Sequence, residues 1–338
     1  MIKKTDLIKQ SITYSYPIKN QTKMNFKGII KGLHHVTATV NEAQEDYDFY
    51  TKTLGLRLIK ETVNFDNESV YHFYYGNETG LPSTVFTTFP YGKQGVRKGV
   101  IGTGQVYETA FSVPSGAFDF WKERLRSKEI SYREEKRFGR PHLLFEDPSG
   151  LKLSILEDGS DNREPVWAAD DIPKENAIIG IHNVMLAVQP DSGIRGFLQF
   201  FGYDETGADG KLSLWETTEK GAGNTLVLFE TDALPEGING LGTVHHVAHR
   251  TANIEDSLKI KEEIEKEYGI SVTDVKDRKY FKSIYFRVPG GVLFEVATEP
   301  PGFLVDESRE ELGSSLKLPN WQETRRKQIE KNLEPYEK

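Results

Sequence analysis

The residues best suited to chemistry in this chain are two pairs of histidines and one glutamate. His34-His35 and His245-His246 each lie in a short apolar run that is typical of a β-strand, and Glu295 lies inside another such run. A buried carboxylate without a partner is costly, so Glu295 needs a cation or a hydrogen-bond donor. Neighbouring side chains on a strand face opposite sides of a sheet, and we expect His35 and His246 to share a face with Glu295. Two imidazoles and one carboxylate form the ligand set that binds non-haem Fe(II).

The strands that carry these histidines belong to a unit that occurs four times. The four copies begin with the apolar runs 33–37, 106–110, 181–185 and 244–248. Each run is followed by a segment with the apolar spacing of an amphipathic helix. Alternating, β-rich runs come after each helix; they are 56–64, 69–75 and 83–89 in the first copy, and 270–275, 281–288 and 292–298 in the last. The repeating unit is therefore β-α-β-β-β.

This repeat predicts an α+β fold in which four βαβββ modules form two open-barrel-like mixed sheets. Because His35, His246 and Glu295 can share one ion only if modules 1 and 4 meet, we expect module 1 to pair with module 4 and module 2 with module 3. Along the chain we predict an N-terminal tail (1–28), a first domain of modules 1 and 2 (29–158), a linker (159–177), a second domain of modules 3 and 4 (178–300) and a C-terminal extension (301–338).

The two middle modules lack the complete ligand set. Glu108 and Asn183 stand where modules 1 and 4 have the second histidine, and Ser154 stands where module 4 has Glu295. Folding of the unit therefore does not require these groups, and the metal site is predicted for modules 1 and 4 alone. The remaining histidines are predicted to be structural: His72, His142, His182 and His249.

The composition excludes several other functions. The 338-residue chain has no cysteine, which rules out a disulfide scaffold, an iron–sulfur cluster and a cysteine nucleophile. Its formal net charge is −8 and it has no long basic run, so we expect no nucleic-acid partner. The longest apolar run, 178–188, is too short to span a bilayer, and no apolar segment follows the charged N-terminus as in a secretory signal. We expect a cytoplasmic protein without a membrane partner, and self-association stays open.

Four motifs resemble those of a known family. They are GLHHVT (32–37), VHHV (244–247), PGGVLFEVAT (289–298) and EPPGFLVD (299–306). Together they resemble the vicinal oxygen chelate superfamily, which includes glyoxalase I, bleomycin-resistance proteins and extradiol dioxygenases. More narrowly, they resemble the four-module dioxygenases that cleave hydroquinone rings. The resemblance implies that both sequence domains are glyoxalase-like.

The resemblance also assigns residues to roles. It implies that Fe(II) is held by His35, His246 and Glu295. It implies a second group of residues around the substrate, which falls on Thr37, His245, Arg278 and Tyr285. Strand alternation points His34 away from His35, and it lets His245 reach a substrate only from a bent or bulged strand.

The expected activity is ring cleavage of a small aromatic diol by O2, with a hydroquinone preferred. An extradiol catechol dioxygenase is the nearest alternative. A glyoxalase-like isomerase or lyase would need a fourth protein ligand, normally an acid on the last strand of the partner unit, and residues 83–89 contain none. A metal-free, aromatic-binding resistance protein is the third alternative, although it would have no use for three retained metal ligands.

Overall fold

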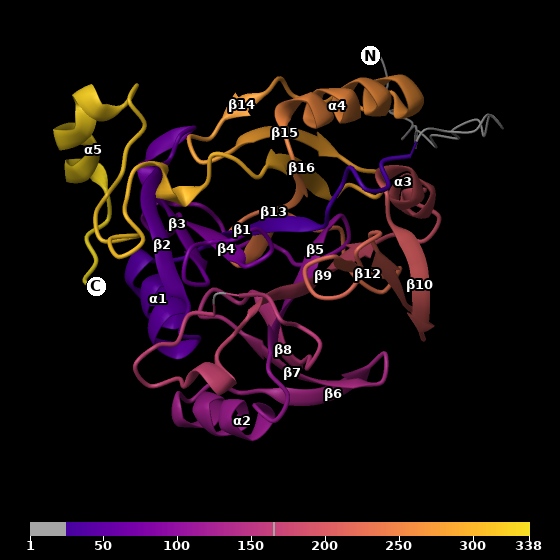
Figure 1. Ribbon diagram of the computed structural model, residues 1–338, viewed down its shortest axis with the longest axis horizontal. Coiled ribbons are helices and arrows are strands. Elements are labelled where there is room, and N and C mark those ends of the chain that lie inside the picture. Colours follow the sequence, from indigo (N-terminus) through magenta and orange to yellow (C-terminus); the bar gives the residue numbers. More distant parts are fainter. Residues whose placement is uncertain (1–24, 165) are drawn as a thin grey trace, which may run out of the picture.

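The computed structural model describes residues 25–164 and 166–338. Its strands form two eight-stranded mixed sheets, one above the other in Figure 1. The first sheet contains the strands of modules 1 and 4, and the second contains those of modules 2 and 3. The predicted α+β architecture and the predicted pairing of modules are confirmed. The sequence domains 29–158 and 178–300 each give one module to each sheet, and that division remains a prediction.

The central strands of each sheet come from different modules. In the first sheet the order is β14 (Lys276–Asp277), β15 (Lys282–Arg287), β16 (Leu293–Thr298), β13 (Thr243–Thr251), β1 (Leu33–Val40), β4 (Val85–Pro90), β3 (Asn67–Gly76) and β2 (Arg57–Asn64). In the second sheet it is β10 (Asp204–Asp209), β11 (Leu212–Glu216), β12 (Thr225–Glu230), β9 (Gly180–Val188), β5 (Gln105–Val113), β8 (Lys152–Glu157), β7 (Arg140–Glu146) and β6 (Arg133–Arg137). The modules meet where β1 pairs with β13 and where β5 pairs with β9, both antiparallel.

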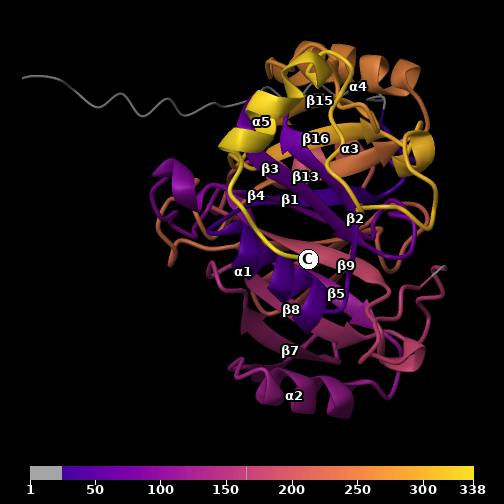
Figure 2. The same cartoon turned by 90° about the vertical axis from the view of Figure 1, so that its left-hand side faces the viewer.

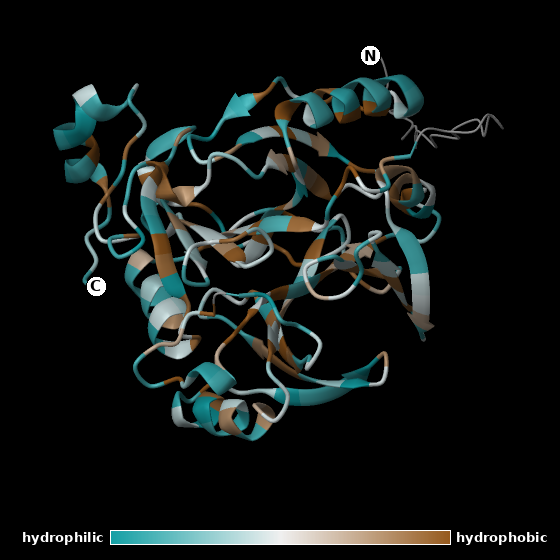
Figure 3. Cartoon of the chain, in the orientation of Figure 1, coloured by the Kyte–Doolittle hydropathy of each residue, from teal (hydrophilic) through white to brown (hydrophobic). Residues whose placement is uncertain are grey.

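The predicted helices are present in all four modules. They are α1 (Ala43–Tyr47), which continues as a π-helical turn (Asp48–Thr53), α2 (Phe118–Ser127), α3 (Ile194–Phe201) and α4 (Ile254–Tyr268), and α5 (Arg326–Asn332) follows in the C-terminal extension. Helix α4 begins after Asn253, whose side chain accepts a hydrogen bond from the Asp256 backbone N–H, as N-cap residues do. Hydrophobic residues concentrate in the strands and hydrophilic ones on peripheral helices such as α4 and α5 (Figure 3).

One predicted strand, 270–275, is wrong. The ladder of module 4 begins only with the two residues of β14. The Thr273 backbone N–H donates to the carbonyl oxygen of Tyr285 at 3.0 Å, and the Tyr285 N–H donates to Thr273 Oγ1, also at 3.0 Å. A threonine hydroxyl thus replaces a backbone acceptor, which is how such side chains compete with regular ladders.

Two β-bulges interrupt the pairing of β1 with β13. Each inserts one extra residue, His34 in β1 and His245 in β13. An extra residue breaks the alternation of side chains along a strand. Leu33 and Val36 therefore both pack in the main core, and His35 between them faces the other side of the sheet. The same two bulges recur between β5 and β9, where register shifts flank the corresponding residues Tyr107 and His182.

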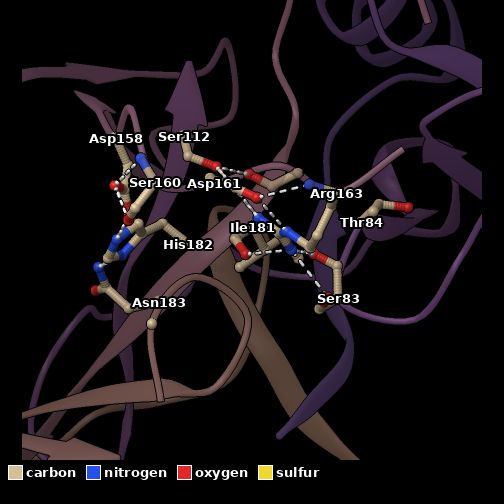
Figure 4. Close-up of polar contacts among 12 residues, drawn as sticks. Ser83, Thr84, Ser112, Asp158, Ser160, Asp161, Arg163, Ile181, His182 and Asn183 are labelled. Atoms are coloured by element: carbon tan, nitrogen blue, oxygen red, sulfur yellow. Dashed lines mark hydrogen bonds and ion pairs between the residues drawn. The ribbon is translucent and has the colours of Figure 1, made fainter. Parts of the chain in front are cut away.

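The predicted linker ties the two sheets together. Arg163 Nη1 donates to the carbonyl oxygens of Ser83 at 2.9 Å and Ile181 at 3.1 Å (Figure 4). Its Nη2 donates to Asp161 at 2.6 Å and to Ser112 Oγ at 3.2 Å. Ser83 precedes β4 of the first sheet, and the other two contacts outside the linker lie in the second sheet. The guanidinium therefore links the start of β4 in the first sheet to β5 and β9 in the second.

The C-terminal extension covers β2 of the first sheet. Lys60 Nζ forms ion pairs with Asp306 at 2.7 Å and with Glu307, and Ile329 and Leu333 pack on Val63. Figure 2 shows α5 and the final segment lying over β2 and β3. The extension thus returns from the last module to the first, on the sheet that carries the predicted ligands.

Of the predicted N-terminal tail, residues 1–24 lie outside the described residues. Phe26 is fully buried, and its N–H donates to the carbonyl oxygen of Phe200 at 3.0 Å. The last residues of the tail therefore pack against α3. No helix in the described part of the chain has the length and apolar character needed to cross a bilayer.

Candidate metal centre

His35, His246 and Glu295 come together at one buried point of the first sheet. Glu295 Oε2 lies 2.8 Å from His246 Nε2 and 3.4 Å from His35 Nε2, and the two Nε2 atoms are 3.4 Å apart. Strands β13 and β16 are parallel, and Ala248 on β13 pairs with Glu295 on β16. His246 lies on β13 two residues before Ala248 and reaches the carboxylate from there. Within residues 25–164 and 166–338 this is the one cluster of three side chains able to share a metal ion.

The protonation preferences of the cluster suit a cation. Burial of Glu295 raises the pKa of its carboxyl, but its interactions with the imidazoles of His35 and His246 outweigh burial and hold that pKa well below its usual value. Burial lowers the pKa of His246, and this outweighs the opposite effect of Glu295. An ionised carboxylate and neutral imidazoles are the forms that bind metals.

One oxygen of Glu295 lacks a hydrogen-bond donor. Oε1 accepts a short hydrogen bond from Ser283 Oγ. Oε2 is fully buried and accepts no aligned hydrogen bond from any described residue, although a buried oxygen of this kind normally has a partner. The free oxygen faces two imidazole nitrogens, so the donor set fits a divalent cation with mixed nitrogen and oxygen ligands.

The bulges place the first histidine of each pair against the second. His34 Nδ1 lies 2.9 Å from His35 Nδ1, and His245 Nδ1 lies 2.8 Å from His246 Nδ1. The prediction that His34 points away from His35 is wrong, because His34 is the extra residue of a bulge. His245 is likewise the extra residue of a bulge and contacts His246, and its predicted role at the substrate stays a prediction.

A small cavity of about 30 Å³ adjoins the three candidate ligands. Besides the ligands, its lining comprises Asn64, Phe65, His72, Tyr74, Arg278, Phe281 and Tyr285. Arg278 Nε donates to Tyr285 Oη at 3.1 Å, and Arg278 Nη1 pairs with Asp66 at 3.0 Å. Two predicted residues, Arg278 and Tyr285, therefore share the cavity with the ligands, whereas His245 and Thr37 do not line it.

Thr37 is connected to the cavity wall by a chain of hydrogen bonds. Thr87 Oγ1 donates to Thr37 Oγ1 at 2.8 Å, and His72 Nε2 lies 2.9 Å from Thr87 Oγ1. His72 Nδ1 in turn lies 2.9 Å from Tyr74 Oη. His72 has the hydrogen bonds expected of a structural histidine, but it also lines the cavity.

The second sheet has an internal ion pair at the equivalent place. Ala110 pairs with Ser154 as Ala248 pairs with Glu295, so Ser154 and Glu108 correspond to Glu295 and His246. Glu108 Oε1 accepts a hydrogen bond from Ser154 Oγ and pairs with Arg137 Nη1, both at 2.7 Å. The guanidinium neutralises the buried carboxylate, and this cluster needs no metal.

The fold, the bulged histidine pairs and the buried ligand set define a class of protein. Residues 32–155 match the Glyoxalase/Bleomycin resistance protein/Dioxygenase superfamily. A relative from Bacillus subtilis (strain 168), named "Putative ring-cleaving dioxygenase MhqE", is 42% identical over 302 residues, which cover 88% of this chain and 97% of the relative. The chain therefore belongs to this superfamily, as its motifs predicted.

The chain is also similar to a named hydroquinone dioxygenase and to a solved structure. The chlorohydroquinone/hydroquinone 1,2-dioxygenase of Sphingobium indicum is 37% identical over 298 residues, covering 86% of this chain and 91% of that enzyme. A crystal structure of a "putative dioxygenase" from Bacillus subtilis matches with a TM-score of 0.86 and 42% identity, over 91% of this chain and 98% of the other.

The sequence did not predict five of the lining residues: Asn64, Phe65, Tyr74, Phe281 and His72, the last of which was expected to be structural only. Phe65 and Asn64 lie at the turn between β2 and β3. The alternation of apolar residues along a strand does not show toward which module the turn after that strand is directed. The position of Tyr74 could have been inferred, because residues two apart on a strand share a face and His72 lies two residues before it.

Proposed function

We propose that this protein is an Fe(II)-dependent dioxygenase that opens the ring of a hydroquinone-type diol with O2. In this proposal His35, His246 and Glu295 hold the iron. The observation that carries it is the meeting of these side chains, with one carboxylate oxygen free of donors, beside a cavity lined by Arg278 and Tyr285. The names of the relatives support ring cleavage, and one of them names hydroquinone.

Fe(II), when bound, supplies a redox-active centre with open positions for both the diol and O2. The neighbouring histidines prepare the ligands for it. With a proton on Nδ1, His35 and His246 donate to His34 and His245 and direct their Nε2 lone pairs toward Glu295. Such outer hydrogen bonds commonly fix the tautomer of metal-binding histidines. His245 therefore acts in the proposal by orienting His246.

Arg278 and Tyr285 would hold the diol. A para-diol can present only one oxygen to the metal, so the protein must hold the far hydroxyl. Burial lowers the pKa of the Arg278 guanidinium, but Tyr285 and Asp66 outweigh burial and raise it, so Arg278 stays charged and offers several N–H groups. Because Tyr285 Oη accepts from Arg278 Nε, its own proton is free to donate to an oxygen beside the ligands. Thr37 does not line the cavity, so in the proposal it acts through Thr87 and His72, to which it is connected by hydrogen bonds.

The net reaction balances without an external reductant. O2 adds across the ring bond between a hydroxyl-bearing carbon and its neighbour, and that carbon–carbon bond breaks. The hydroxyl-bearing carbon becomes a carboxylic acid and its neighbour an aldehyde, so both oxygen atoms stay in the ring-opened product. The two electron pairs that reduce O2 come from the diol itself. The protein groups only hold the ring and move protons.

Among the described residues, no fourth acidic ligand of the glyoxalase kind joins the cluster of His35, His246 and Glu295. The β4 residue in the position of Glu295 is Thr87, which pairs with Thr37 as Glu295 pairs with Ala248. A threonine hydroxyl hydrogen-bonded to Thr37 and His72 is not an acid–base equivalent of a carboxylate. This favours oxygenation over isomerisation.

Oxygen uptake by the anaerobically iron-loaded protein tests the proposal. We expect one O2 consumed per hydroquinone, with two labelled atoms in the product from ¹⁸O2. A catechol preference of tenfold or more in kcat/KM, about 1.4 kcal/mol in transition-state binding, would refute the para-diol assignment alone. Isomerisation of a methylglyoxal–thiol adduct without O2 would favour the glyoxalase alternative, and diol binding without any metal would favour the resistance-protein alternative.

A further inference from the structure

The cavity beside the candidate ligands is too small for the diol proposed above. Its volume is about 30 Å³, and one water molecule requires roughly 10–15 Å³. A six-carbon ring with two hydroxyl groups cannot enter a space that holds two or three water molecules. Part of the wall must therefore move before an aromatic substrate reaches the ligands.

Most of the wall is fixed by packing and hydrogen bonds. The ligands lie on central strands of the sheet. Tyr74 and Phe281 are buried in a core cluster, and both ring nitrogens of His72 have hydrogen-bond partners. Well-packed groups of this kind have few alternative positions.

The turn between β2 and β3, residues 65–66, is held by partly exposed contacts, although Phe65, itself partly buried, also packs against the cluster around Val63. Phe65 lines the cavity and makes an edge-to-face contact with Trp321. The centres of the two rings are 5.7 Å apart. Asp66 pairs with Arg278, which also lines the cavity. The side chain of Asp66 is 68% exposed, and Trp321 is 55% exposed, so solvent weakens both contacts.

We propose that the 65–66 turn opens to admit the diol and that Phe65 then packs on the bound ring and limits the substituents it can carry. This inference rests on the proposed function and names a residue that determines its substrate range. Arg278 connects the two events, because the guanidinium that pairs with Asp66 is the one expected to bind the far hydroxyl. The pair between Arg278 Nη1 and Asp66 breaks when the turn opens, which leaves Arg278 Nη1 free to bind the far hydroxyl of the entering diol.

Anaerobic binding to the Fe(II)-loaded protein separates this role from turnover. Dissociation constants are measured for hydroquinone and 2-tert-butylhydroquinone with the wild type, Phe65→Leu, Phe65→Ala and Phe120→Ala. Phe120 is a matched control, because it is another partly exposed phenylalanine. It lies on α2, in module 2, whose strands belong to the other sheet. We expect Phe65→Ala to improve binding of the bulky diol relative to hydroquinone by at least tenfold, Phe65→Leu to lie between, and Phe120→Ala to match the wild type.

Tryptophan fluorescence reports the movement of the turn directly. Because Trp321 touches Phe65, anaerobic hydroquinone binding should change its emission, and the change should vanish in Trp321→Phe. If diols bind but the size preference of Phe65→Ala stays that of the wild type, the inference is wrong and the proposed function stands. If no diol binds to the iron-loaded wild type or drives O2 uptake, the proposed function fails, and the inference fails with it.

Discussion

Removing Arg137 should destabilise the protein strongly without affecting the candidate metal centre. Arg137 pairs with Glu108 in the second sheet at 2.7 Å, where the two side chains are 8% and 3% exposed. Its Nε also donates to Glu135 at 2.6 Å. Arg137→Met removes the cation and leaves Glu108 as a buried carboxylate with one hydrogen bond, from Ser154. Arg137 is the one ion-pair partner of Glu108 among the described residues, so its removal leaves the carboxylate without a paired cation.

The expected loss is about 3–5 kcal/mol of unfolding free energy, the usual cost of removing one partner of a buried ion pair. At roughly 2 °C per kcal/mol for a large domain, this lowers Tm by roughly 6–10 °C. The double variant Glu108→Leu with Arg137→Met should recover most of the loss, because it removes both charges. Arg195→Met is the control, since Arg195 is 45% exposed in its pairs with Glu205 and Glu230, and exposed pairs contribute about 0–1 kcal/mol.

Calorimetry with the metal-free and iron-loaded proteins measures these differences. Iron content and hydroquinone turnover at 20 °C should be the same in all three variants as in the wild type. The account of the second sheet is refuted if Arg137→Met is no less stable than Arg195→Met. It is also refuted if the double variant is as unstable as Arg137→Met.

Three other outcomes follow from the structure. Arg278→Ala should lower kcat/KM for hydroquinone by about 10–100-fold, the loss of a charge-assisted hydrogen bond of about 1.5–3 kcal/mol, while iron content stays constant; a parallel loss of iron would show that Arg278 acts on the ligands instead. His182→Ala should leave iron content unchanged, because His182 pairs with Asp158 in the second sheet, and iron loss measured by elemental analysis would contradict this. Burial raises the pKa of Asp46 to about 8, so its contribution to the free energy of unfolding is full below pH 4 and is lost as pH rises through 8. Between pH 5 and 8.5, Tm should therefore fall less in Asp46→Asn than in the wild type. An equal fall of Tm with pH in the two proteins would contradict the raised pKa of Asp46.

The repeat and the ligand set were predictable because both depend on local patterns. Side-chain alternation selects His35, His246 and Glu295, and requiring one shared ion then pairs module 1 with module 4. The family motifs add Arg278 and Tyr285, which do line the cavity.

The remaining features depend on contacts that no local pattern encodes. The direction of His34 follows from a bulge, which is a property of the pairing of β1 with β13 and not of either strand alone. Residues 270–275 have a β-rich composition, but Thr273 competes for the hydrogen bonds of Tyr285. Phe65 reaches the cavity from a turn of module 1 whose contacts are with Arg278 of module 4 and with Trp321 of the C-terminal extension.

Iron stoichiometry in Glu295→Gln tests the central claim most directly. The substitution keeps the size of the side chain and removes the charge that faces His35 and His246. Glu108→Gln is the matched control, because it makes the same change at a buried strand position of the second sheet. After anaerobic loading and desalting, we predict about one iron per chain in the wild type and in Glu108→Gln, and almost none in Glu295→Gln. Equal iron content in Glu295→Gln and the wild type would contradict the assignment of the metal centre.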